Sequence, residues 1–159
     1  MAATHEAINV RTLTDTRLVI TRDFAAEPAR VFRAFTDADE VCQWLSSVER
    51  PMSLCAIDFR PGGNWRYAWQ GKGGRDIAVG GTFVEIDEPF RTVHTESFEI
   101  DWTAGDTVVT TNFDEVDGNT RVTTYIEYPS PESLDAVLTM NMPRDLIAAY
   151  RRLDTLLAG

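Results

Sequence analysis

The chain has 159 residues, 43% of them apolar, and its 15 basic residues against 25 acidic ones give a formal net charge of −10. A chain of this length is typical of one domain whose core is large enough to fold without a disulfide or a metal ion. The excess of acidic residues argues against binding to nucleic acid or to an anionic membrane, because both carry negative charge. No apolar run reaches the roughly 18 residues that a transmembrane helix needs, so we expect no membrane partner.

The N-terminal residues 1–16 lack the apolar stretch of a signal peptide, and we expect them to form a flexible lead-in. We expect residues 17–159 to form a single domain. Two cysteines, Cys42 and Cys55, lie in apolar segments without paired spacing. That arrangement is typical of buried, reduced thiols in a cytoplasmic protein.

One strand and two short helices are predicted first. Residues 17–24 alternate in polarity as a strand does. Residues 27–35 have the apolar spacing of a helix with a proline near its start. Residues 37–45 follow as a second short helix, in which Asp37 and Glu40 have the spacing of a capping box.

From residue 54 onward the apolar period changes to two, which predicts a run of strands joined by glycine-rich turns. Connections this short leave no room for crossover helices, so the sheet is expected to be antiparallel. The predicted strands are residues 54–60, 64–70, 75–86, 91–100, 106–116 and 120–128.

The segment from residue 130 to residue 159 predicts a long amphipathic helix. Ser130 suits the N-cap, and Pro131 suits the first helical position, where no amide proton is needed. Pro143 removes a helical amide and clashes with the preceding turn, so we expect a kink or a short break there. The apolar stripe consists of Leu134, Val137, Leu138, Met142, Leu146, Tyr150, Leu153 and Leu157.

Three segments, residues 27–45, 58–69 and 81–95, together resemble the family of activator-of-Hsp90-ATPase homologue domains. This family belongs to the START or Bet v 1-like superfamily, and the resemblance extends over roughly residues 17–157. It implies an α+β helix-grip fold. In that fold a curved antiparallel sheet, here of about six or seven strands, wraps around a long C-terminal α-helix, with two short helices after the first strand.

The resemblance implies a protein that binds a small hydrophobic ligand in an internal apolar cavity and needs no cofactor. Two alternatives stay open. The first is an enzyme, such as a cyclase, dehydratase or hydrolase, acting on a bound polycyclic or acyl substrate. The second is an accessory partner of Hsp90, the activity for which the family is named.

Aromatic residues are the first candidates for a cavity wall. Trp65, Tyr67 and Trp69 share one face of their predicted strand, and they either fill a core or line a pocket. In a helix-grip layout Tyr150 of the long helix would face these three rings. The remaining candidates for the lining are Trp44, Phe83, Trp102 and Leu146.

The chemistry-bearing residues are sparse, and no catalytic residue is assigned. His5 and His94 are too few and too separated for a metal site, and Cys55 has no basic neighbour that would lower its pKa. General acid–base chemistry remains open for charged strand residues that face inward, whereas outward ones would be solvated surface charge. The residues concerned are Arg66, Arg75, Asp76, Glu85, His94 and Glu96.

Overall fold

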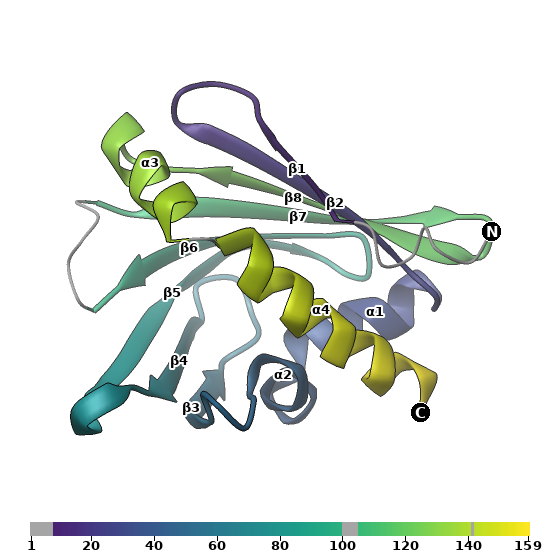
Figure 1. The fold of residues 1–159 in the computed structure, drawn as a ribbon. Coiled ribbons are helices and arrows are strands. Elements are labelled where there is room, and N and C mark those ends of the chain that lie inside the picture. The colour runs from purple at the N-terminus through teal and green to yellow at the C-terminus, as the bar shows by residue number, and fades with distance from the viewer. Residues whose placement is uncertain (1–7, 100–104, 141) are drawn as a thin grey trace.

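The computed structural model describes residues 8–99, 105–140 and 142–159. Over these residues, eight antiparallel strands form one curved sheet in the order β1-β2-β8-β7-β6-β5-β4-β3, and four α-helices accompany it (Figure 1). The strands are β1 (Asn9–Thr12), β2 (Arg17–Phe24), β3 (Met52–Ile57), β4 (Asn64–Gln70), β5 (Asp76–Asp87), β6 (Arg91–Phe98), β7 (Thr107–Val116) and β8 (Asn119–Glu127). The helices are α1 (Pro28–Thr36), α2 (Ala38–Leu45), α3 (Pro131–Thr139) and α4 (Met142–Ala158), and a 3-10 helix, η2 (Lys72–Gly74), joins β4 to β5.

The α+β architecture with a curved antiparallel sheet and a C-terminal helix is confirmed, but the sheet has eight strands instead of six or seven. The extra strand, β1, comes from the segment that we expected to be a lead-in, and it pairs with β2, with Val10 opposite Ile20. The prediction of a flexible lead-in was therefore wrong for residues 9–12. Because β1 precedes β2, the two short helices follow the second strand instead of the first. β1 is a short edge strand with mostly exposed side chains, so its sequence alternates only weakly. Residues 1–7 lie outside the described residues.

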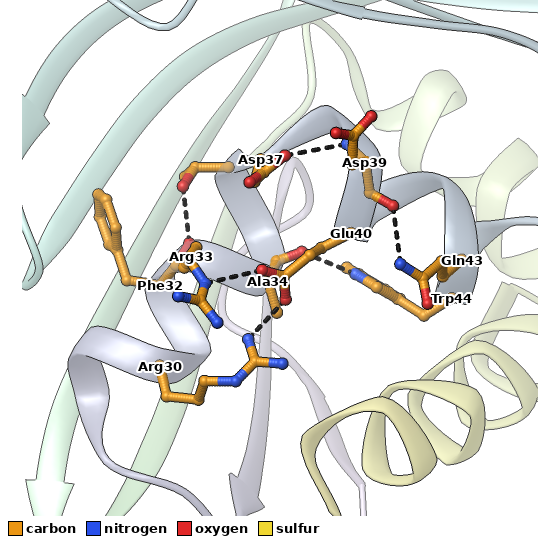
Figure 2. A network of polar contacts seen from close by, with 10 residues as sticks. Arg30, Phe32, Arg33, Ala34, Asp37, Asp39, Glu40, Gln43 and Trp44 are labelled. Atoms are coloured by element: carbon orange, nitrogen blue, oxygen red, sulfur yellow. Dashed lines mark hydrogen bonds and ion pairs between the residues drawn. The ribbon is translucent and has the colours of Figure 1, made fainter. Parts of the chain in front are cut away.

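The connection between α1 and α2 is held by charged side chains (Figure 2). The Asp37 carboxylate accepts a hydrogen bond from the Asp39 amide (3.0 Å), as an N-cap residue does. Glu40, however, does not act as the second half of a capping box. Its carboxylate pairs with Arg30 (2.5 Å) and Arg33 (2.7 Å) of α1, and thereby fixes the angle between the two helices.

The predicted strands after α2 are confirmed with small shifts of their ends. The largest shift is in β3, which ends at Ile57 because the Gly63 amide donates to the Arg60 carbonyl (2.8 Å) and closes a turn there. The hairpin between β7 and β8 turns at Asp117 and Gly118, whose φ angles of 54° and 82° are the positive values that a tight type I′ turn requires.

The predicted break near Pro143 is also confirmed. α3 begins after Ser130, whose hydroxyl accepts a hydrogen bond from the Ser133 amide (3.2 Å), and ends at Thr139. α4 begins at Met142, so Pro143 occupies its first turn, where a missing amide proton costs no hydrogen bond. The C-terminal element is therefore two helices in sequence.

Three apolar clusters hold these elements together. Figure 1 shows α4 crossing one side of the curved sheet, with α1 and α2 beside its C-terminal half. The α4 core contains Phe24, Val31, Phe32, Ala34, Trp44, Phe113, Val122, Ala149, Tyr150 and Leu153. The α3 core contains Leu18, Ile20, Tyr128, Leu134 and Val137. The β4–β5 cluster contains Trp65, Val79 and Phe83, with Tyr67 and Trp69 packed against it.

A buried ion pair joins β2 to α4. The Arg22 side chain is only 2% exposed, and its guanidinium donates two hydrogen bonds to the Asp154 carboxylate (2.5 and 2.7 Å). The guanidinium also lies over the rings of Phe24 (4.6 Å) and Tyr150 (5.8 Å). Because a charge is placed inside an aromatic core, its carboxylate partner is required for the core to be stable.

We predict that Asp154→Asn lowers the free energy of unfolding by about 2–3 kcal/mol. This is less than the roughly 3–5 kcal/mol of a fully buried pair, because 32% of the Asp154 side chain is exposed and water screens the charge that remains. Urea unfolding measures the change. The matched control is Asp145→Asn on the same helix, where an exposed side chain lies 4.0 Å from Arg144, and we expect a change within about 0.5 kcal/mol. Equal losses in the two variants would contradict the prediction.

Candidate functional site

The eight residues predicted to line a cavity lie in different parts of the structure. Trp44 and Tyr150 are buried in the α4 core with their ring centroids 5.9 Å apart, and Trp44 donates its indole N–H to the Ala34 carbonyl (2.8 Å). Leu146 is half-buried between the α4 core and the α3 core. Trp102 lies outside the described residues. Within the described part of the chain, the ring contacts of Tyr150 are with the α4 core, where burial raises its pKa to about 12.

The other predicted residues come together on β4 and β5. Trp65, Tyr67 and Trp69 share one face as the alternation predicts, with ring centroids 4.8 Å apart for the first pair and 6.2 Å for the second. Trp65 and the neighbouring Phe83 are buried, whereas the other two rings are half-buried. The Trp69 indole donates to the Leu45 carbonyl at the end of α2 (2.9 Å), so this is the face of the sheet that the helices cover.

β6 adds two titratable side chains to the same face. The His94 and Trp65 rings form a T-shaped pair, with 5.2 Å between centroids. In the sheet register His94 is opposite Val109 and Glu96 is opposite Thr107, and both of these partners are buried. The His94 and Glu96 side chains nevertheless remain 20% and 32% exposed, with Nε2 3.8 Å from the carboxylate oxygen. Partial exposure on the covered face makes this pair the centre of the candidate site.

Two phenols complete a set of side chains that we call the inner polar group: Tyr67, His94, Glu96 and Tyr128. Burial is the largest cause that raises the pKa of Tyr67, followed by the charges of Cys55 and Glu96. Burial and the charge of Glu96 raise the pKa of Tyr128 in the same way. Both phenols are therefore protonated at neutral pH and can donate or accept a hydrogen bond.

The other charged residues that we considered for acid–base chemistry are exposed, three of them on strands and Arg75 directly before β5. Three of them have a polar partner within hydrogen-bonding distance, and the fourth, Arg75, is exposed. The pairs are Arg66 with Glu99 (2.7 Å), Arg91 with Glu85 (2.8 Å) and Ser53 with Asp76 (2.9 Å). Their expected role as solvated surface charge holds, and among the six candidates only His94 and Glu96 face the helices.

A hollow lies on the outer face of the sheet, beside Gly80 and Gly81. Its charged groups, Arg66 and Glu99, bind each other and are about half exposed. The hollow is open to solvent, and these two charged groups are already paired with each other.

Nucleophilic and metal chemistry find little support in the described residues. Burial, followed by the charges of Cys42 and Asp39, raises the pKa of Cys55 to about 11, so its thiol is protonated at neutral pH. In the part of the chain that the structure describes, no group of three or more histidine, cysteine, aspartate and glutamate side chains is placed to hold a metal ion. None of the described helices is long and apolar enough to cross a membrane.

Sequence reasoning missed Tyr128 and assigned Tyr67 only an apolar role. The alternation of β8 gave a signal. Tyr128, directly after this strand, is an even number of residues from the buried Val122 and so lies on the same face. Nothing in the local sequence, however, brings Tyr128 close to Glu96. That neighbourhood depends on the pairing of β6 with β7 and of β7 with β8.

One family model matches most of the chain, and solved structures share its fold. A family model described as activator of Hsp90 ATPase homolog 1-like protein matches residues 25–158. A crystal structure from Rhodobacter sphaeroides is 32% identical, with a TM-score of 0.87 over 96% of this chain and 98% of that chain. One from Mycobacterium smegmatis is 28% identical, with a TM-score of 0.84 over 95% and 97%. A solution structure from Arthrobacter aurescens, 21% identical with a TM-score of 0.81 over 98% and 92%, shows the shared fold alone. No curated protein matches the chain closely enough to count as a relative.

We predict that iodoacetamide alkylates Cys55 slowly near neutral pH and that the rate rises until the pH reaches about 11, because the thiolate is the reacting form. Mass spectrometry of the Cys55 peptide measures the rate, with circular dichroism to confirm that the chain stays folded. The same peptide in denaturant is the control, and its rate should level off nearer the ordinary thiol pKa of about 8.5. A plateau at that lower pH in the folded chain would contradict the prediction.

Proposed function

Because this chain belongs to the family of activator of Hsp90 ATPase homolog 1-like proteins, we propose that it binds a small hydrophobic ligand between the curved sheet and its C-terminal helices. Membership of the family confirms the resemblance found in the sequence, and the fold is that of ligand-binding domains. The observation that carries the proposal is the partial exposure of Tyr67, Trp69, His94 and Glu96 on the helix-covered face of the sheet.

The position of the three clusters supports this location. α3 and α4 pack over β2 and β8 through the α3 core, and α1, α2 and α4 close the α4 core. The inner polar group extends from the α3 core, which contains Tyr128, to the β4–β5 cluster, against which Tyr67 packs. A face that only filled a core would bury its rings and exclude a carboxylate, because an unpaired charge in a dry core is costly. Aromatic walls with a few convergent polar groups are typical of small-molecule sites.

An enzyme is the second candidate, and one observation favours it. His94 and Glu96 face inward with 3.8 Å between their nearest polar atoms, so a bound substrate would meet an imidazole and a carboxylate together. Such a pair can transfer protons to and from a substrate. Chemical analysis of a bound compound after long incubation with the protein separates the two functions, since a binder returns it unchanged.

We predict that the amides of residues 134–139 in α3 exchange with solvent faster than those of residues 146–157 in α4, so that α3 acts as a lid. α3 is short, and its exposed Leu138, like Met140 directly after the helix, contributes little to burial, whereas α4 buries Leu153 completely. Hydrogen exchange measured by mass spectrometry tests this. The amides of β7 and β8 provide the reference for global unfolding. Equal protection of both helices would contradict the prediction that α3 acts as a lid.

We predict that at least one compound in a panel of fatty acids, fatty alcohols and flavonoids quenches tryptophan fluorescence and raises the melting temperature. A ligand that binds only the native state stabilises it by mass action. The best compound should bind more weakly to Trp69→Ala. The free energy of unfolding of that variant should fall by less than the roughly 3–5 kcal/mol that removal of a buried aromatic side chain costs, because the Trp69 ring is only half-buried.

Trp65→Ala is the matched comparison on the same strand and face. Trp65 is 5% exposed, so removing its ring should lower the free energy of unfolding by the full amount of about 3–5 kcal/mol. If no compound in the panel binds and Trp69→Ala is destabilised as much as Trp65→Ala, the rings fill a solid core and the proposed function is wrong.

A further inference from the structure

The carboxylate of Glu96 differs from the other carboxylates of the sheet strands. On the outer face, Glu85 of β5 is bound to Arg91 (2.8 Å), and Glu99, directly after β6, is bound to Arg66 (2.7 Å). Among the described residues, Glu96 receives no hydrogen bond, and His94 Nε2 lies 3.8 Å from its carboxylate, beyond hydrogen-bonding distance. Glu96 thus presents free acceptor oxygens on the concave side of the sheet.

The surroundings of Glu96 are poor in positive charge. Arg22 also lies on the helix-covered face, but both of its terminal nitrogens bind Asp154. The whole chain carries a net charge of −10. An anionic ligand head would therefore meet a like charge without an arginine or lysine partner among the described residues of this site, and would lose its own hydration as well.

The aromatic side chains near His94 and Glu96 suit a ligand that is apolar except for a hydrogen-bond donor at one end. Trp65 and Phe83 lie against His94, at 5.2 and 6.1 Å between ring centroids, and Tyr67 lies against Trp65. Aromatic faces favour both hydrocarbon and cationic groups. A hydrogen bond to a carboxylate is about twice as strong as one between neutral groups.

Resting on the proposed function, we propose that the inner polar group selects the ligand by its head group. Glu96 accepts a hydrogen bond from a hydroxyl or a protonated amine at the end of an apolar molecule, and it disfavours carboxylate ligands. Alcohols and amines share the donor chemistry, and amines add a charge opposite to that of Glu96.

The test uses three compounds that share a hydrocarbon chain and differ in their head group: 1-decanol, decylamine and decanoate. Each is used below its aggregation concentration near neutral pH. Calorimetric affinities and melting temperatures are measured for the full chain. We expect the alcohol or the amine to bind at least about tenfold more tightly than decanoate. In Glu96→Gln the amine should lose about tenfold in affinity and decanoate should gain, because the repelling charge is gone.

Glu85→Gln is the matched control, since Glu85 lies on the outer face, and its affinities for all three compounds should equal those of the unmodified chain. Melting temperatures without ligand show that both variants fold. If decanoate binds as tightly as the other two, or if Glu96→Gln leaves the order of affinities unchanged, the inference is wrong while the proposed function stands. If none of the three compounds binds and the wider panel also fails, the proposed function is wrong and the inference with it.

Discussion

The ion pair between Arg22 and Asp154 is the interaction on which the position of α4 depends. It joins residues 132 apart in sequence and places a guanidinium against the rings of Phe24 and Tyr150. Taking these charges out of water is costly, and two short hydrogen bonds together with the aromatic faces offset that cost. The Nε atom of Arg22 has no partner within the described structure, so the geometry is set by the terminal nitrogens alone. With α4 held at this end, its N-terminal half and α3 extend over the other end of the sheet.

That arrangement separates a closed region from a more open one. Around the ion pair, α1, α2 and α4 bring together ten buried residues, which include Trp44 and Leu153. Toward β5 and β6 the sheet carries polar side chains that no helix covers completely, among them Glu96. The dense packing supports the fold, and the open region is where we propose that a ligand binds. A site placed on rigid strands beside a well-packed core is held more accurately than one carried by loops.

Most of the fold was predictable because its elements have strong local patterns. The alternation of β4 placed Trp65 and Tyr67 on one face, and Pro143 marked the break between α3 and α4. β1 was not predicted, since a short polar edge strand is stabilised by its neighbour more than by its own sequence. The site was less predictable. Tyr150 and Trp65 both suit a pocket wall in the sequence, yet they pack in different clusters, because helix rotation and strand register depend on contacts distant in the chain.

The order of strands in the sheet has a consequence for the synthesis of the chain on the ribosome. β2 pairs with β8, with Arg17 opposite Glu127, so the edge of β2 that faces β8 stays unpaired until β8, the last strand of the described sheet, has been translated. Unpaired strand edges are prone to pair with other chains during such a delay. β1 lies directly before β2 and forms a hairpin with it, which covers the other edge from the start. The short strand at the border of the sheet therefore protects the nascent chain, and closure of the sheet is a late, long-range step of folding.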